Sequence, residues 1–211
     1  VVEQFQTDTA DYADLVLPTT VTGSWPRPSW FTEVLRGTFL AVPAEDGLHA
    51  QSSFAAIGHF ARFVQPGAQS VALNRVLGAE PSQILGQLSA NGQVFLLNPH
   101  GVLFGANARV DVGGLVASTL SLSNEDFAAG RFKLQASAGA GSVNNAGQIT
   151  AAKGGYVVLA APQVHNSGTI STHLGHSVLA AGEHVTLQLQ GGGLLGYRIE
   201  RGALQALVEQ A

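Results

Sequence analysis

The chain has 211 residues, of which 45% are hydrophobic, 11% are charged and 26 are glycine, and it contains no cysteine. This composition excludes a disordered chain, because enough apolar side chains are present to bury a core, and it excludes a disulfide framework. The net charge of −4 comes without a cluster of Lys and Arg, so no nucleic acid partner is expected.

Residues 1–47 differ in composition from the rest of the chain. They contain both tryptophans and seven of the fourteen acidic residues. Thr7–Pro18 resembles a short run in molybdopterin oxidoreductases, and Thr20–Trp30 resembles the start of cobalamin-independent methionine synthases. Neither run is long enough to form a domain or to bring a cofactor site. We therefore expect 1–47 to be an atypical, fused or poorly ordered segment and 48–211 to form the folded domain.

From residue 48 onward, short runs of Val, Leu, Ile and Phe are separated by Gly, Asn and Ser. Such runs, bounded by turn-forming residues, are typical of β-strands. The predicted strands are Ser70–Leu73, Val94–Leu97, Val102–Phe104, Leu115–Ser118, Tyr156–Ala160, Ser177–Ala180 and Val185–Leu189. Only two short segments, Phe31–Leu40 and Ala203–Ala211, have a pattern compatible with a helix.

The second half of the sequence repeats with a period of 21 residues. Val143–Thr150 matches Val164–Ser171 at Val, Asn, Gly and Ile. The same shift aligns Val157 with Val178, Val158 with Leu179, Ala160 with Ala181 and Gly92 with Gly113. A repeat this short cannot bury its own apolar face, so each repeat must stack on the next. We predict an all-β solenoid with three short strands per coil, about seven or eight coils in all; a globular β-sandwich is the less favoured alternative.

Stacked coils assign roles to the recurring polar residues. Asn145 is expected to lie beneath Asn166 and to form a ladder of side-chain amides at a turn. Gly147 and Gly168 are expected to supply a positive φ that other residues resist.

Three segments together resemble one family. They are Phe63–Gly78, Ile84–Gly105 and Val110–Thr119. The combination resembles the amino-terminal two-partner secretion domain of filamentous haemagglutinin-type exoproteins, also called the haemagglutination activity domain. The resemblance and the repeats together extend to about Leu204.

The resemblance implies a right-handed parallel β-helix that is secreted or displayed on the surface of a Gram-negative bacterium. The chain would cross the periplasm and pass through an outer-membrane β-barrel transporter that carries POTRA domains. It would then fold and template the β-helix of the passenger behind it. Gly202–Ala211 falls where another coil would begin, so we expect a domain truncated at its C-terminus.

The family's Asn-Pro-Asn-Gly-Ile motif is matched at Asn98, Pro99 and Gly101, whereas His100 and Val102 depart from it. His enters left-handed conformations more easily than most residues, so we expect the turn to survive. Asn74 matches a second asparagine of the family.

Two roles for this motif remain open. It is a tight turn in which Pro fixes φ and Asn bonds to its own backbone, or it is in addition the signal that the transporter recognises. Recognition would proceed by strand addition, in which an extended segment pairs with the edge of a POTRA sheet.

Other patterns do not indicate catalysis. Gly191–Gly196 satisfies the GxGxxG spacing but opens no helix, so we interpret it as a strand turn. His173 and His176 lie near other histidines, but no Cys or nearby carboxylate completes a metal site, and we expect exposed turn residues. Glu125 and Asp126 are expected in a polar loop, and no two carboxylates recur at the 21-residue spacing.

We therefore expect no enzyme, no cofactor and no metal. A β-helical adhesin module that binds a host glycan or receptor directly is the alternative function. If the whole protein contacts a host cell, we expect that activity to reside in the passenger.

Overall fold

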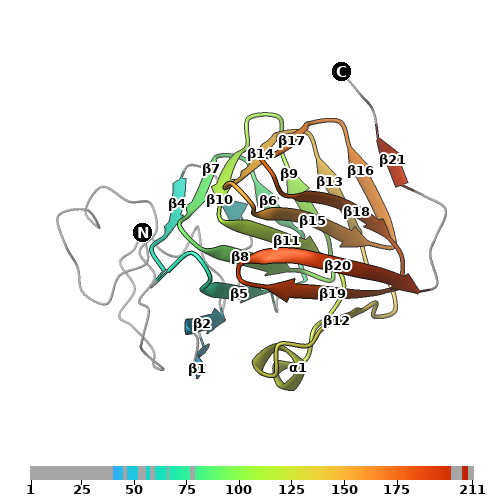
Figure 1. The fold of residues 1–211 in the computed structure, drawn as a ribbon. Coiled ribbons are helices and arrows are strands. Elements are labelled where there is room, and N and C mark those ends of the chain that lie inside the picture. Colours follow the sequence, from blue (N-terminus) through green and yellow to red (C-terminus); the bar gives the residue numbers. More distant parts are fainter. Residues whose placement is uncertain are drawn as a thin grey trace, which may run out of the picture.

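The computed structural model describes residues 40–44, 47–51, 56–57, 60–65, 67–76, 79–200 and 206–208 (Figure 1). The predictions for residues 1–39 lie outside this part of the chain. Strand β1 (Leu40–Ala44) pairs antiparallel with β2 (Gly47–Gln51). Within the described residues, no helix is long and apolar enough to span a membrane.

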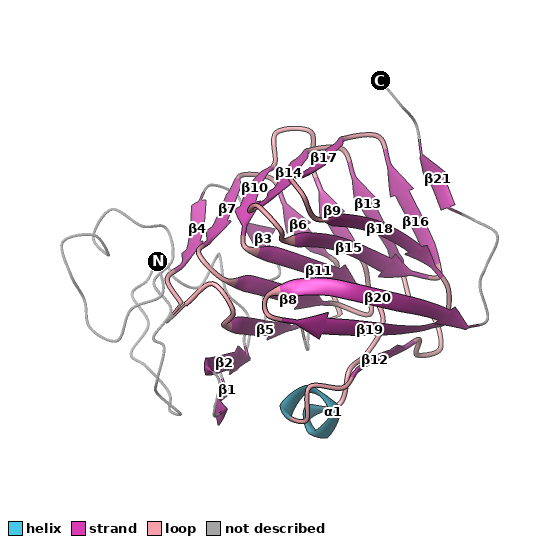
Figure 2. Cartoon of the chain, in the orientation of Figure 1, coloured by secondary structure: helices cyan, strands magenta, loops and turns pink. Residues whose placement is uncertain are grey.

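Three parallel sheets form the body of the domain, as a β-helix requires (Figure 2). Sheet 1 contains β3 (Ala56–Ile57), β6 (Ser82–Ile84), β9 (Val102–Phe104), β13 (Ser142–Asn145), β16 (Gln163–Asn166) and β21 (Ala206–Val208). Sheet 2 contains β4 (Phe60–Phe63), β7 (Gln87–Ala90), β10 (Arg109–Val112), β14 (Gln148–Ala151) and β17 (Thr169–Thr172). Sheet 3 contains β5 (Val71–Arg75), β8 (Gln93–Leu97), β11 (Gly114–Ser118), β15 (Tyr156–Ala161) and β18 (His176–Ala181). Each coil contributes one strand to each sheet, so the predicted three-strand coil is confirmed.

Two insertions leave the helix and return to it. The first contains α1 (Asn124–Ala128) and β12 (Phe132–Gln135), and the second is a hairpin of β19 (His184–Gln190) and β20 (Gly193–Glu200). Together they form an antiparallel lateral sheet in the order β12-β19-β20. The described residues contain five full coils and β21, fewer than the seven or eight coils predicted. The prediction counted the residues of the two insertions as parts of coils. The segment Ala203–Ala211, whose pattern is compatible with a helix, contains strand β21 instead, which pairs in parallel with β16.

The predicted stacking register is confirmed in sheets 1 and 2. Val143 pairs with Val164, and Ile149 pairs with Ile170, both 21 residues apart. In sheet 3 the register between the last two strands is 20, so Val158 pairs with Val178 and the predicted pairing with Leu179 is wrong by one residue. The turn before β18 is therefore one residue shorter than the turn before β15.

That shorter turn places a leucine in a glycine conformation. Leu174 has a φ of 54°, and the equivalent residue of the coil below is Gly154, with a φ of 77°. Among the described residues, Leu174 is the one non-glycine residue with positive φ. Its side chain is 73% exposed, so the turn gains no burial from it.

The predicted asparagine ladder is present. Asn145 Nδ2 donates to Asn166 Oδ1 at 2.7 Å, and both side chains are buried. The ladder lies at the ends of β13 and β16, however, and neither asparagine has a positive φ. The amides instead satisfy buried backbone groups, for example Gly147 N–H, which donates to Asn145 Oδ1 at 3.1 Å.

The prediction of positive φ at Gly147 and Gly168 is wrong. Glycine is required there for another reason. A Cβ on Gly147 would lie 2.6 Å from the carbonyl oxygen of Gly105 in the coil below, and a Cβ on Gly168 would meet the carbonyl oxygen of Gly147. Adjacent coils approach too closely at this corner for any side chain.

Sheet 3 separates two apolar cores, which explains why its strands are apolar on both faces. Val94, Leu115 and Val157 face the inside of the helix. The alternate residues Phe95, Val116 and Val158 face outward and are covered by the lateral sheet. The outer core also contains Leu120, Leu122, Phe127, Leu134, Val185, Leu187 and Leu194 from the two insertions.

A buried tyrosine on β15 contacts two other strands of sheet 3, β8 and β11. The Tyr156 hydroxyl donates to Gln93 Oε1 at 2.5 Å, and the ring passes over Gly114, where a Cβ would lie 2.9 Å from it. Burial raises the pKa of the Tyr156 phenol far above its usual range. The phenol therefore stays protonated at neutral pH.

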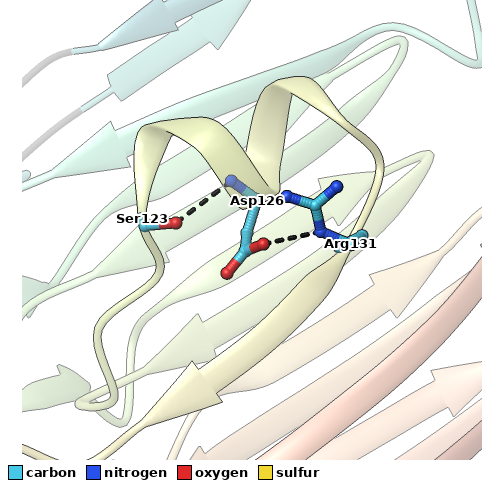
Figure 3. Close-up of polar contacts among 3 residues, drawn as sticks. All are labelled: Ser123, Asp126 and Arg131. Carbon is cyan, nitrogen blue, oxygen red and sulfur yellow. Dashed lines mark hydrogen bonds and ion pairs between the residues drawn. The ribbon is translucent and has the colours of Figure 1, made fainter.

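The segment expected to be a polar loop contains helix α1. Ser123 caps the helix, because its hydroxyl accepts the N–H of Asp126 at 3.0 Å. The Asp126 carboxylate accepts Arg131 Nε at 2.7 Å, and Figure 3 shows both contacts. Phe127 anchors the helix to the outer core through edge contacts with Phe95 and Phe132, at centroid distances of 6.0 and 6.1 Å.

The contribution of Asp126 to stability should depend on pH. The hydrogen bond from Arg131 lowers the pKa of the Asp126 carboxyl below its ordinary value of 3.8. A lowered pKa stabilises the folded state above pH 3.8, and this effect is lost as the pH falls through the folded-state pKa. We expect Asp126→Asn to lower the urea midpoint slightly at pH 7 and less at pH 2.5. Glu125→Gln is the control, and an equal decrease for Asp126→Asn at both pH values would contradict the prediction.

Candidate functional site

The Asn-Pro-His-Gly motif forms the tight turn that connects sheet 3 to sheet 1. Asn98 follows β8 directly, and the N–H of Gly101 donates to the carbonyl oxygen of Asn98 at 3.1 Å, which closes a β-turn. Asn98 Oδ1 also accepts the N–H of His100 at 2.9 Å, the local bond that asparagine makes in such turns. Val102 is buried and begins β9.

His100, one of the two residues that depart from the family motif, does not adopt a left-handed conformation. His100 does not have a positive φ, and the positive φ of this turn, 131°, is at Gly101. The expected tolerance of histidine for left-handed conformations is therefore not what preserves the turn. His100 is exposed and uses its backbone to form the turn. Replacing its side chain should leave the fold intact.

The turn is held between the coils on either side of it. The N–H of Ser82 in the coil below donates to the carbonyl oxygen of Gly101 at 3.0 Å. On the other side, the N–H of Gly141 donates to the carbonyl oxygen of Pro99 at 2.7 Å. Gly141 is the residue at which the first insertion returns to the helix, and a Cβ there would lie 2.7 Å from the His100 carbonyl oxygen.

The Asn98 side chain is fully buried and its amide is bonded on both sides. Nδ2 donates to the carbonyl oxygen of Glu80 at 2.9 Å and to Ser82 Oγ at 3.0 Å. The carbonyl oxygen Oδ1 accepts His100 N–H. In the folded domain, Asn98 cannot reach a binding partner.

Asn74 is also fully buried, on the neighbouring strand β5. Its Nδ2 donates to the carbonyl oxygens of Ala72, at 3.3 Å, and Phe95, at 3.2 Å. It lies opposite Leu96, two residues before Asn98, so the two asparagines lie in adjacent coils near the same corner. Each satisfies backbone groups of that corner.

Ser82 and Gly141 also belong to the site, although the sequence did not predict either of them. Ser82 is 16 residues before Asn98, and its hydroxyl is one of the two acceptors of the Asn98 amide. Gly141 is separated from the turn by the whole first insertion. The 21-residue repeat carries no signal for either contact, because neither separation equals the period.

The remaining candidate patterns have structural roles. Gly191 and Gly192, with φ values of 60° and 84°, form the turn of the β19–β20 hairpin, which confirms the interpretation of the GxGxxG pattern. His173 lies in the turn before β18 and His176 begins that strand. In the part of the chain that the structure describes, no group of three or more His, Cys, Asp or Glu side chains is arranged to hold a metal ion.

Comparison with known proteins gives consistent matches. The family model described as the TPS secretion domain matches residues 51–209. A heme/hemopexin-binding protein of Haemophilus influenzae (strain ATCC 51907 / DSM 11121 / KW20 / Rd) is 37% identical over 156 residues, which cover 70% of this chain. A second heme/hemopexin-binding protein from the same species is 49% identical over 61 residues, which cover 29% of this chain and 7% of that protein. The chain matches only 17% of the length of the first relative.

The fold is also similar to a solved structure. The crystal structure of the HMW1 secretion domain from Haemophilus influenzae superposes with a TM-score of 0.63 at 29% identity, covering 83% of this chain and 50% of that one. None of these matches is to an enzyme family.

Proposed function

Because the chain belongs to the TPS secretion domain family, we propose that it is the part of a secreted exoprotein that an outer-membrane transporter recognises. The transporter would be a β-barrel with periplasmic POTRA domains, and the exoprotein would reach it through the periplasm of a Gram-negative bacterium. The observation that carries this proposal is the family match over residues 51–209. The likeness to the HMW1 secretion domain supports it independently through the fold.

The burial of the motif supports recognition of the unfolded chain. Asn98 is 0% exposed and bonded within the fold, whereas His100 is exposed. A transporter that reads the Asn98 amide must therefore read it before the β-helix forms. An extended segment around Asn98 that pairs with the edge of a POTRA sheet would expose the Asn98 amide to the transporter.

The open end of the helix supports a templating role. Strands β17 and β18 each end their sheet, so each has one edge without a strand partner among the described residues. Strand β21 already continues sheet 1 beyond them. A parallel strand that follows can pair with these edges without forming a new nucleus, and folding of a passenger would proceed from this end.

The test compares two buried asparagines. Asn98→Ala and Asn145→Ala each remove a bonded amide and should each cost about 1–3 kcal/mol of folding stability. We expect the urea-denatured Asn98→Ala chain to lose binding to the transporter's periplasmic region, and denatured Asn145→Ala to bind like the unchanged chain. Because both chains are unfolded when mixed, stability cannot produce the difference.

A third variant tests the motif without a loss of folding stability. His100→Asn restores the family residue at an exposed position and should bind at least as tightly as the unchanged chain, with the same urea midpoint. Equal binding by all three variants would overturn a recognition role for the motif and leave it as a turn.

The alternative is an adhesin module whose folded surface binds a glycan or receptor. It predicts that the refolded chain, and not the denatured chain, binds host-cell material, and that the transporter region binds neither form. The curated relatives' names refer to heme and hemopexin. Since the match covers 17% of the first relative's length, we propose that an exoprotein's ligand binding, and any catalysis, lie outside this domain.

A further inference from the structure

Strand β20 carries two large apolar side chains that are substantially exposed among the described residues. Tyr197 is 54% exposed and Ile199 is 36% exposed, two residues apart on the strand. They are directly opposite Leu187 and Val185 of β19, which are 3% and 0% exposed. Residues that pair directly across two strands point to the same face of the sheet. Tyr197 and Ile199 therefore share the inner face of the lateral sheet.

The position of β20 explains why this inner face is uncovered. In the lateral sheet, β12 is at one edge and packs near β8, because Phe132 and Phe95 have ring centroids 5.4 Å apart. Strand β20 is at the opposite edge and contacts β18, the last strand of sheet 3. The lateral sheet lies across sheet 3 (Figure 1), and its β20 edge faces the open end of the helix. Tyr197 and Ile199 therefore lie on the edge strand that contacts the last strand of sheet 3, and they stay partly exposed there.

The stacking register identifies what fits beneath them. The outward-facing residues of β18 that pack on the hairpin are Val178 and Ala180, which follow Val164 by 14 and 16 residues. Ala206 of β21 lies opposite Val164 and occupies the same place in the sixth coil. The third strand of that coil would pair with β18 and would present its own outward-facing residues directly below Tyr197 and Ile199.

We propose that the inner face of β20 at Tyr197 and Ile199 is the docking surface for the sheet 3 strand of the next coil, the coil that β21 begins. The occupant is a parallel β-strand with small or aliphatic residues facing outward, as Val178 and Ala180 do in β18. This inference rests on the proposed templating role but not on transporter recognition. The hairpin then holds the first passenger coil in place through side-chain packing, in addition to the backbone pairing that β18 offers.

The experiment uses tyrosine nitration of the folded protein. In the 211-residue chain, Tyr197 should be nitrated, whereas Tyr156 should not, because its side chain is fully buried. An extended chain carries Ser167–Ala181 a second time directly after Val208, which continues the coil in register because Val208 pairs with Asn166. We expect Tyr197 nitration in the extended chain to fall to the level of Tyr156.

Amide hydrogen exchange of β18 reports whether the added coil has docked. If β18 exchanges more slowly but Tyr197 is nitrated as before, the coil has docked without covering Tyr197 and the proposal is overturned. Loss of Tyr197 nitration in the 211-residue chain at raised protein concentration also overturns it, because a second copy of the chain would then cover this face. If the added coil does not dock, the same two readouts are taken on the secreted exoprotein, where unprotected Tyr197 overturns the proposal.

A pair of substitutions gives an independent check. Tyr197→Ser should lower the urea midpoint of the extended chain by more than that of the 211-residue chain, in which the residue is already 54% exposed. Leu85→Ser is the matched control, because Leu85 is 43% exposed at the corner after β6, away from the open end. Leu85→Ser should change the urea midpoint equally in the 211-residue chain and the extended chain. If Tyr197→Ser also changes the two midpoints equally, the proposal is overturned.

Discussion

We expect Gly147→Ala to destabilise the β-helix by about 2–3 kcal/mol, as overpacking a closely packed site does. The added methyl group would lie 2.6 Å from the Gly105 carbonyl oxygen and 2.8 Å from Ala108 Cβ. One obstructing atom is a backbone oxygen and the other is a Cβ, and neither can move away by a change of rotamer. The coils themselves would have to separate, which weakens the Asn145 ladder beside them. Equilibrium unfolding in urea measures the loss.

Gly139→Ala separates the two reasons for which glycine is required. Gly139 has a φ of 75°, but nothing lies within 4 Å of a Cβ added there. Its substitution costs only the strain of a left-handed residue, about 1–2 kcal/mol. If Gly139→Ala lowers the free energy of unfolding more than Gly147→Ala does, close approach of the coils is not the stronger reason for glycine, and positive φ is.

The repeat made the coil predictable because residues one period apart in the sequence contact each other in adjacent coils. Val143 and Val164 recur at the spacing at which they stack, and the buried amides of Asn145 and Asn166 require each other. Where one residue is missing from a turn, as before β18, the aligned sequence gives no sign of it. The apolar run Ser177–Ala180 permits either register, so the predicted pairing of β15 with β18 was wrong by one residue.

The lateral sheet was not predictable from the repeat for a different reason. Strand β12 pairs with β19, about 50 residues later, and neither strand recurs in another coil. Helix α1 has five residues, too few for a helical period to be visible. Only the two-sided apolar character of sheet 3 indicated that something must cover its outer face. In the motif, the identity of the turn was predictable, but its contacts with Ser82 and Gly141 depend on which coils lie next to it.

The outer core should make a large contribution to stability, and Phe95→Ala tests it. Phe95 is 0% exposed, and its ring contacts Phe127 and Phe132, with centroids 6.0 and 5.4 Å away. Removing a buried phenylalanine ring leaves a cavity and costs about 3–5 kcal/mol. Because Phe95 faces the insertions, we expect amide exchange to accelerate first in α1 and β12, while the three sheets of the helix remain protected.

The inner core provides the matched variant for this prediction. Phe104 is also 0% exposed but faces the inside of the helix. Phe104→Ala should cost a similar free energy, about 3–5 kcal/mol, yet accelerate exchange throughout the stacked sheets. If both variants lose protection in the same residues, the two cores unfold as one unit. If Phe95→Ala opens only the lateral sheet, the insertions are a separable cover on an independently stable β-helix, and the coils alone can support the chain that stacks on β18.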